Sequence, residues 1–295
     1  MSAKVKDKIA TIVLYIISSL VILLLVMFIG YIIYNGRFSL NPNFLFGEPK
    51  FAEAGGGIGR QLFNSFYLLI IAMIITIPLG LGAGIYLAEY AKEGRLLNII
   101  RLCIETMASL PSIVVGLFGL LVFVQLTGWG YTVLSGALAI AILNLPSLTR
   151  VSENAIRAAS KGVKEASLGL GATQWQTIKK VILPSAIPQI LTGIILAAGR
   201  IFGEAAALLY TAGMSASKLN FSNVSLTNKT SPFSLFRPSE TLAVYIWKLN
   251  SEGMVPDAAK IAGGAAAVLV IMVLLFNVLA RLLGKWIYNS YTGTK

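Results

Sequence analysis

Residues 148–185 read LTRVSENAIRAASKGVKEASLGLGATQWQTIKKVILPS, a polar and basic segment between two long, mostly uncharged ones. The segment is much longer than a simple connection between helices, which usually has roughly two to eight residues. Its first part, 149–160, contains neither Gly nor Pro and is predicted to be helical. Two further helices are predicted over 163–168 and 174–183. The segment is therefore expected to fold as a group of short helices.

The turn between the last two of these helices is marked by its residues. Gly169 and Gly171 can supply the positive φ that a sharp turn needs. Thr173 is the expected N-cap of the next helix, and Gln176 completes a capping box with it. Pro184 is expected to end that helix. The result is a basic helix-turn-helix that suits contact with a partner protein.

The composition places the rest of the chain in a membrane. Of the 295 residues, 56% are hydrophobic and 12% are charged, whereas soluble domains carry about 25% charged residues. The single cysteine, Cys103, excludes a disulfide framework. The absence of histidine excludes most zinc sites and all Ser-His or Cys-His nucleophiles. A soluble enzyme is therefore not the expected class.

Several uncharged runs exceed the roughly 20 residues that a helix needs to cross a bilayer. The run between Glu105 and Arg150 is too long for one crossing, and the Gly-containing stretch 127–130 is predicted to split it. We predict an all-α polytopic membrane protein, a single transmembrane domain over 1–295, with a loop at 213–261 that carries a surface helix over 240–249. The six predicted membrane helices are at about 9–34, 62–88, 106–126, 131–147, 187–212 and 262–283.

The distribution of positive charge predicts the orientation. Fifteen of the 24 Lys and Arg residues fall on the side of loop 148–185, and eight fall on the other side. Cytoplasmic loops carry the excess of Lys and Arg, so loop 148–185 and both termini are predicted to be cytoplasmic. The first helix is read as a retained anchor, because its apolar run is too long for a signal peptide. The net charge of +12 then reflects topology, and no nucleic-acid partner is expected.

The loop resembles a known motif. Three parts of it carry the resemblance: Glu165-Ala166-Ser167, Gly171 and, after nine intervening residues, 181–184 (VILP). Together they resemble the EAA loop of ABC-importer permeases. The resemblance implies a type I ABC-importer permease fold whose cytoplasmic coupling helix docks on an ATPase subunit. The alternative is an amphipathic helix on the membrane surface. The residues expected to contact the ATPase subunit are Glu165, Ala166, Gly171, Trp175, Leu183 and Pro184.

Further stretches resemble one branch of that family, the phosphate-specific permeases of the PstA type. At 203–207 this chain reads Gly-Glu-Ala-Ala-Ala, whereas the branch usually reads Gly-Glu-Thr-Ala-Pro. Ala205 and Ala207 therefore depart from the pattern of the branch. The matching stretches are 54–59 (AGGGIG), 84–91 (GIYLAEYA), 110–120 (LPSIVVGLFGL) and 203–213 (GEAAALLYTAG).

The resemblance implies inward transport of inorganic phosphate across the cytoplasmic membrane by alternating access. No Gly-x4-Gly-Lys-Ser/Thr loop occurs, so ATP is expected to be hydrolysed by a separate subunit. No cofactor or metal is expected on this chain, which is not itself an enzyme. The implied partners are a second homologous permease in a heterodimer, two ATPase subunits, an extracytoplasmic phosphate-binding protein and membrane lipid. The alternatives are import of sulfate, molybdate or phosphonate, an anion channel, or an intramembrane enzyme.

Two charges lie inside a predicted membrane helix. Arg200 and Glu204 are four residues apart, so they are expected to share one helix face and to pair. A guanidinium can bind a phosphate oxyanion through two parallel hydrogen bonds. Arg200 and Glu204 are therefore candidates for the substrate path, together with Ser109 and Ser112 beside Pro111. The alternative is a structural ion pair toward a neighbouring subunit.

Two pairs of glycines are spaced for close helix packing. Gly80 and Gly84 form one Gly-x-x-x-Gly pair, and Gly199 and Gly203 form the other. Small residues at this spacing let two helix backbones approach each other. Both pairs are predicted to be packing contacts.

Overall fold

The computed structural model describes residues 3–50, 53–215, 217–252 and 255–292, and most of them are helical. Short segments of other helical geometry are labelled η. The elements are α1 (Ala3–Gly36), η1 (Arg37–Ser39), α2 (Pro42–Phe46), α3 (Gly59–Ile85), η2 (Tyr86–Tyr90), α4 (Arg95–Ala108), α5 (Ser112–Gly119), η3 (Leu120–Leu126), α6 (Val133–Ser160), α7 (Val163–Gly169), α8 (Gln174–Thr177), η4 (Ile178–Ile182), α9 (Leu183–Gly203), α10 (Ala206–Leu209), α11 (Leu242–Glu252) and α12 (Ala258–Thr292). Of these, η1 is a 3₁₀ helix, and η2, η3 and η4 are π-type segments that continue longer helices.

Within the described residues, five helices are long and apolar enough to cross a membrane, and α4 with α5–η3 forms a sixth candidate that is bent by 97°. The helical membrane fold is therefore confirmed. The expected helix over 106–126 is wrong in shape, because the chain breaks between Ala108 and Ser112. Pro111 explains the break, since it lacks an N–H and disfavours helical geometry in the residue before it. The predicted turn at 127–130 is present, and Gly128 and Gly130 both have positive φ.

Helix α6 is longer than predicted. The sequence predicts two separate helices, a membrane span at 131–147 and a cytoplasmic helix at 149–160. This expectation is wrong, because α6 continues through Pro146 to Ser160. Helix α3 packs along α6 on both sides of that proline. Tertiary packing thus holds the helix together where the local sequence favours a kink.

Helix α9 also differs from its expected bounds. The chain is helical from Gln174 to Gly203 through the π segment η4, so the expectation that a helix ends at Pro184 is wrong. Pro184 has no backbone N–H to donate to the preceding turn, and the wider hydrogen-bond pattern of the π segment η4 accommodates this gap. The helix can therefore continue through the proline. Helix α9 then ends at Gly203, well before the expected position 212.

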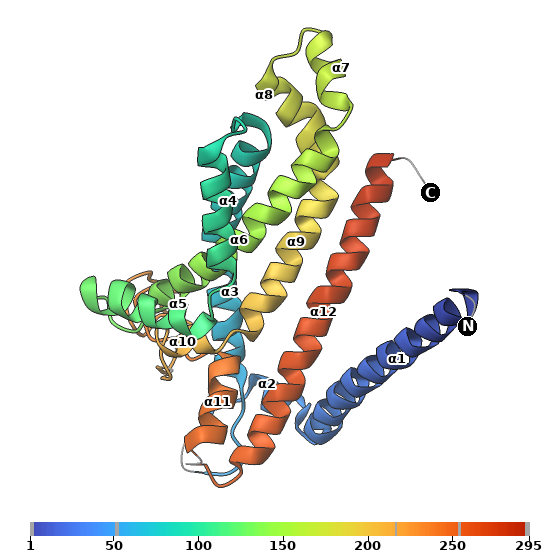
Figure 1. Cartoon of the computed structure of the whole chain (residues 1–295). Helices are drawn as coiled ribbons and strands as arrows, with labels where there is room; N and C mark the ends of the chain where they lie inside the picture. The colour runs from blue at the N-terminus through green and yellow to red at the C-terminus, as the bar shows by residue number, and fades with distance from the viewer. Residues whose placement is uncertain (1–2, 51–52, 216, 253–254, 293–295) are drawn as a thin grey trace.

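The bundle has two distinct ends. Helices α7 and α8 lie at one end and α2 and α11 at the other, with α3, α6, α9 and α12 running between them (Figure 1). We call these the α7 end and the α11 end. One hydrophobic cluster, which includes Leu68, Ile140 and Phe202, fills the bundle toward the α11 end. A second cluster lies toward the α7 end and consists of Ala155, Ile156, Ile178, Ile182, Ala186 and Ile190.

Helix α1 stands apart from the bundle (Figure 1). None of its most apolar 18-residue window is buried. It meets α12 where Gly36 approaches the backbone of Gly263 and the side chain of Ala267. Its apolar surface is therefore available to lipid or to another subunit.

The segment after α10 is closely attached to the bundle at the α11 end. Arg237 is fully buried, and its guanidinium donates hydrogen bonds to the carbonyl oxygens of Pro232 and Pro238. Its own carbonyl accepts from the backbone N–H of Val133 at the start of α6. The predicted surface helix over 240–249 is present as α11, two residues displaced at its start.

Candidate functional site

The predicted coupling residues lie in two different environments. Glu165, Ala166 and Trp175 are exposed on α7 and α8, which project from the α7 end (Figure 1). Gly171 lies in the turn between these helices with φ of 86°. No residue of α7 is buried. These four residues form an exposed hairpin tip that is suited to contact with another protein.

The hairpin is shaped by the local sequence as expected at most positions. Thr173 and Gln176 form the capping box, with Gln176 N–H donating to Thr173 Oγ1 and Thr173 N–H donating to Gln176 Oε1. Gly171 adopts the left-handed conformation that glycine favours. Gly169 does not, because it closes α7 with ordinary helical geometry. One left-handed glycine is enough to reverse the chain here.

Leu183 and Pro184 are not at the hairpin tip. Both are half-buried at the start of α9, and Leu183 packs against the second hydrophobic cluster. They fix the joint between the hairpin and α9. The structure thus separates them from Glu165, Ala166, Gly171 and Trp175.

Sequence reasoning missed the apolar part of the hairpin tip. Leu170 is 89% exposed, and Leu168 and Trp175 are also exposed. Apolar side chains grouped on a projecting surface mark a protein contact more often than isolated ones do. The available signal was a leucine between two glycines in an otherwise polar turn.

Arg200 and Glu204 do not share a helix face. Helix α9 ends at Gly203, and Glu204 has extended backbone with ψ of 128°. The Glu204 carboxylate faces its own chain instead, 3.5 Å from the backbone N–H of Ala207. No ion pair joins the two side chains in the described part of the chain. The expected pairing is wrong because the helix stops one residue too early.

Arg200 lines a cavity between α6 and α9. The cavity measures about 200 Å³. Its polar lining beside Arg200 comes from Asn144 and Ser147, three residues apart on α6. The Asn144 amide donates to the carbonyl oxygen of Ile140. Sequence reasoning missed both α6 residues, although two amide and hydroxyl side chains inside an apolar helix were a readable signal.

Ser109 and Ser112 lie elsewhere, on either side of the bend between α4 and α5. The Ser109 hydroxyl donates to the carbonyl oxygen of Thr106 at 2.8 Å. Neither serine lines the Arg200 cavity. The structure of this chain therefore does not bring the four predicted path residues together.

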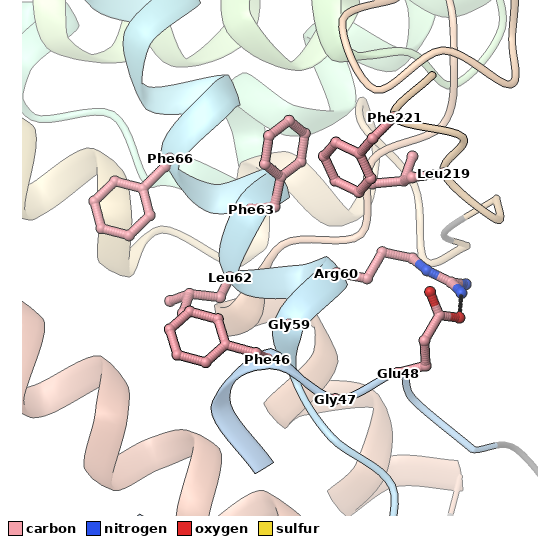
Figure 2. Close-up of a pocket in the computed structure, with 10 residues that line it drawn as sticks. All are labelled: Phe46, Gly47, Glu48, Gly59, Arg60, Leu62, Phe63, Phe66, Leu219 and Phe221. Atoms are coloured by element: carbon pink, nitrogen blue, oxygen red, sulfur yellow. Dashed lines mark hydrogen bonds and ion pairs between the residues drawn. The ribbon is translucent and has the colours of Figure 1, made fainter. Parts of the chain in front are cut away.

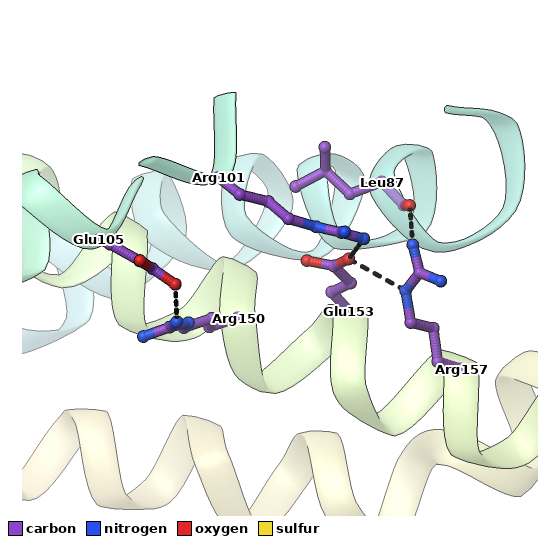
Figure 3. A network of polar contacts seen from close by, with 6 residues as sticks. All are labelled: Leu87, Arg101, Glu105, Arg150, Glu153 and Arg157. Atoms are coloured by element: carbon purple, nitrogen blue, oxygen red, sulfur yellow. Dashed lines mark hydrogen bonds and ion pairs between the residues drawn. The ribbon is translucent and has the colours of Figure 1, made fainter. Parts of the chain in front are cut away.

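A network of charged side chains joins α4 to α6 near the α7 end (Figure 3). The Glu153 carboxylate, only 8% exposed, accepts from Arg101 of α4 at 2.7 Å and from Arg157 at 3.0 Å. Glu105 of α4 pairs with Arg150 of α6. These residues line a cavity of about 330 Å³. Glu105 is thus part of the α4–α6 contact.

A third cavity lies near the α11 end and is lined mainly by apolar side chains. It measures about 380 Å³, and an ion pair between Arg60 and Glu48 lies at its edge (Figure 2). The Glu48 carboxylate already occupies the guanidinium of Arg60 and would repel an anion, whereas no carboxylate is among the described residues that line the Arg200 cavity. This third cavity therefore suits an anion less well than the Arg200 cavity does. Its apolar lining comes from Phe46, Leu62, Phe63, Phe66, Leu219 and Phe221.

The α11 end also holds two buried charges. Glu240 is fully buried and accepts from Gln61 at 2.8 Å and from Lys248 at 3.1 Å. Burial raises the pKa of its carboxyl above the usual value, and the contacts with Gln61 and Lys248 oppose that rise. Burial lowers the pKa of the Arg237 guanidinium to about 10. Glu240 fastens the segment between α10 and α11 to α3, and Arg237 fastens it to α6.

Two curated proteins show how the chain compares in sequence. It is 54% identical over 293 residues to the probable ABC transporter permease protein YqgI of Bacillus subtilis (strain 168), covering 99% of this chain and 100% of that one. It is 36% identical over 241 residues to the phosphate transport system permease protein PstA of Yersinia pestis, covering 80% and 75%.

Solved structures agree on the fold. A chain of the MetNI methionine ABC transporter in an inward-facing conformation is 17% identical, with a TM-score of 0.60 over 77% of this chain and 94% of that one. A chain of a bacterial alginate ABC transporter, in complex with its alginate-bound periplasmic protein, is 16% identical, with a TM-score of 0.62 over 96% and 97%. The expected type I ABC-importer permease fold is thereby confirmed.

The family follows from a match over most of the chain. Residues 80–292 match the family described as binding-protein-dependent transport system inner membrane component. Members of this family are non-catalytic membrane subunits. The chain therefore belongs to this family and is a permease subunit of an ABC importer.

Proposed function

We propose that this permease subunit carries inorganic phosphate inward across the cytoplasmic membrane. The observation that carries the proposal is the similarity to relatives named phosphate transport system permease protein PstA, such as the one from Yersinia pestis at 36% identity. A second such relative, from Xylella fastidiosa (strain 9a5c), is 35% identical over 77% of this chain. The name of the Bacillus subtilis relative carries no substrate.

The chemistry of the Arg200 cavity supports an oxyanion as cargo. A guanidinium remains charged at any relevant pH and presents parallel N–H groups to two oxygens of a phosphate. Asn144 and Ser147 add polar atoms to the same cavity. Since a charged residue at membrane depth costs at least about 2.5–3.5 kcal/mol, the polar side chains of Asn144 and Ser147 beside Arg200 support a transport role for this cavity. Glu204 and the two serines at the α4–α5 bend lie outside this cavity, and in this proposal they contribute at other points along the path.

The hairpin of α7 and α8 is the proposed contact with the ATPase subunit. Glu165, Ala166, Gly171 and Trp175 are placed on an exposed tip, and the apolar side chain of Leu170 stands beside them. ATP hydrolysed on that subunit would move the hairpin, and the permease would alternate its access. Leu183 and Pro184 hold the hairpin on α9.

The proposed assembly has this chain in a heterodimer with a second homologous permease. Two cytoplasmic ATPase subunits bind at the α7 end, and an extracytoplasmic phosphate-binding protein binds at the α11 end. The charge distribution, which predicts the α7 end and both termini to be cytoplasmic, supports this orientation.

Uptake into proteoliposomes tests the cargo. The chain is reconstituted with its partner subunits, and ATP-dependent uptake of labelled phosphate is measured against excess sulfate, molybdate and a phosphonate. Inhibition by unlabelled phosphate alone is the expected result. Inhibition by another of these anions, with uptake of its labelled form, would overturn phosphate as the cargo. Uptake that continues without ATP would indicate a channel instead.

A further inference from the structure

The hairpin that projects from the α7 end is joined to α3 by one residue. Glu89 lies in η2, which continues α3, and its side chain is 1% exposed. The Nζ atom of Lys164 on α7 lies 2.7 Å from Glu89 Oε2. The side-chain amide of Gln174 on α8 donates to the carbonyl oxygen of Glu89 at 2.7 Å. Both helices of the hairpin therefore contact the same residue.

Few other contacts could position α7. None of its described residues is buried. The hydroxyls of Ser167 and Thr177 lie 2.9 Å apart, but that contact is within the hairpin itself. The apolar attachment comes later, at Ile178 and Ile182 in the second hydrophobic cluster. Glu89 thus gives α7 a direct polar link to the end of α3, in addition to the indirect route through the cluster.

Polar contacts continue from η2 to α4. Arg157 of α6 donates to the carbonyl oxygen of Leu87 at 2.9 Å, two residues from Glu89 (Figure 3). The same guanidinium donates to Glu153, which also accepts from Arg101 of α4. A chain of contacts therefore runs from the hairpin through η2 and α6 to α4.

The segment η2 is suited to a change of shape. Its π-type turn leaves the backbone with a wider hydrogen-bond pattern than an α-helix, and such segments occur often at functional positions. Helix α4, at the other end of the contacts, is bent by 97° away from α5 at Pro111. Within the described residues, no continuous helix therefore couples the orientation of α4 to that of α5.

We propose that Glu89 is the positioning residue that transmits displacement of the α7–α8 hairpin to α3 and, through Arg157 and Glu153, to α4. The inference rests on the proposed docking of the hairpin on an ATPase subunit and holds for any cargo. The Lys164–Glu89 ion pair fixes the hairpin to η2, so that ATP-driven movement of the hairpin becomes a movement of the transmembrane helices.

The test compares transport with ATP hydrolysis in the complete complex. Glu89→Gln, Lys164→Gln and the exchange Glu89→Lys with Lys164→Glu are reconstituted, and phosphate uptake per ATP hydrolysed is measured. We expect both single variants to hydrolyse ATP while uptake per ATP falls at least about fivefold, and the exchange to restore most of it. Lys161→Gln removes an exposed charge close to Lys164 and should leave the ratio unchanged.

Alkylation of Cys103 gives a second readout that does not depend on the cargo. Cys103 is exposed on α4, and its labelled peptide can be quantified by mass spectrometry. Nucleotide is expected to change the alkylation rate in the wild type and in the exchange variant, but not in Glu89→Gln. The same change in Glu89→Gln as in the wild type would overturn the proposal.

The outcomes separate this inference from the proposals on which it rests. A purely structural role would lower the amount of complex, and uptake and hydrolysis would then fall together with an unchanged ratio. That result, or an unchanged ratio in a stable Glu89→Gln complex, overturns the role of Glu89 alone. ATPase subunits that still co-purify with Leu170→Asp would instead show that the hairpin does not dock. Failure of phosphate as cargo leaves the Cys103 readout intact.

Discussion

At the scale of single residues, Arg200 carries the most specific prediction. If its guanidinium binds the oxyanion, Arg200→Gln should lower phosphate uptake at least about tenfold, which corresponds to about 1.4 kcal/mol. Arg200→Lys keeps the charge but loses the planar pair of donors, so it should recover only part of the rate. Uptake into proteoliposomes at equal amounts of complex measures both.

The matched control for this substitution is Lys180→Gln, which removes an exposed positive charge on η4. It should leave uptake unchanged. Loss of the complex in Arg200→Gln would favour the alternative in which Arg200 forms a structural ion pair with a neighbouring subunit. Normal uptake in a stable Arg200→Gln complex would remove Arg200 from the path.

Residue-level prediction from the sequence worked where the chemistry was local. The capping box of Thr173 and Gln176 depends on four consecutive residues, so its pattern was sufficient. The pairing of Arg200 with Glu204 assumed an uninterrupted helix, and the end of α9 at Gly203 separates them. The contribution of Asn144 to the Arg200 cavity depends on how α6 packs against α9, which no local pattern specifies.

At the scale of helices, the glycines of α3 and α9 give a matched comparison. A Cβ atom added at Gly84 would collide with the Cβ of Ser152 and lie 2.9 Å from the backbone nitrogen of Glu153, whereas one added at Gly203 would meet its nearest atom at 4.0 Å. Gly84→Ala should therefore cost about 1–3 kcal/mol through overpacking, and Gly203→Ala should cost little. The predicted packing role is thus supported for the α3 glycines only.

Thermal unfolding of the purified chain measures this difference. About 1 kcal/mol lowers the melting temperature by roughly 2–4 °C in proteins slightly smaller than this one. Gly84→Ala should melt several degrees below the wild type, and Gly203→Ala close to it. Equal melting temperatures for the two variants would mean that α3 and α6 can separate to accept the methyl group.

The hairpin tip gives a prediction for an interface. Leu170 is 89% exposed in the isolated chain, so an ATPase subunit that covers it would desolvate an entire leucine side chain. Leu170→Asp should weaken co-purification of the ATPase subunit at least about tenfold, because a charge would be buried in an apolar contact. Leu226→Asp makes the same change at an exposed leucine between α10 and α11 and should not affect it. Unchanged binding in Leu170→Asp would place the contact elsewhere.

Elements were predictable where composition alone decides them. Long apolar runs identified the membrane helices, and Gly128 and Gly130 marked the turn after η3 correctly. Prolines were less informative, because Pro111 breaks the chain whereas Pro146 lies inside α6. The difference arises from α3, which packs along α6 and supports it. Such support is a tertiary effect and is absent from the local sequence.

At the scale of the whole molecule, the two ends of the bundle differ in whether their charged groups are exposed or buried. The α7 end projects an exposed hairpin and holds exposed arginines beside α4. The α11 end buries its polar groups, among them Arg237 and Glu240. From the sequence, the segment 213–261 is predicted to be a loop with a surface helix. The burial of Arg237 and Glu240 cannot be predicted, because it depends on contacts with α3, which is far away in the chain. The α7 end therefore has more exposed groups available for contact with another subunit than the buried polar groups of the α11 end provide.

The buried carboxylate of Glu240 makes the stability of the α11 end depend on pH. Its pKa is raised by burial above the ordinary value of a glutamate carboxyl, so the folded chain binds this proton more tightly than the unfolded chain does. Its contribution to the free energy of unfolding is therefore largest at low pH and is lost as the pH rises through the folded-state pKa.

The variant Glu240→Gln removes this titration. The melting temperature of the wild type minus that of Glu240→Gln should increase as the pH is lowered from about 8 to about 5. Glu252→Gln, at an exposed carboxylate of the same helix α11, should show no such trend. A constant difference between the wild type and Glu240→Gln over this range would mean that Lys248 and Gln61 compensate the burial of Glu240 completely.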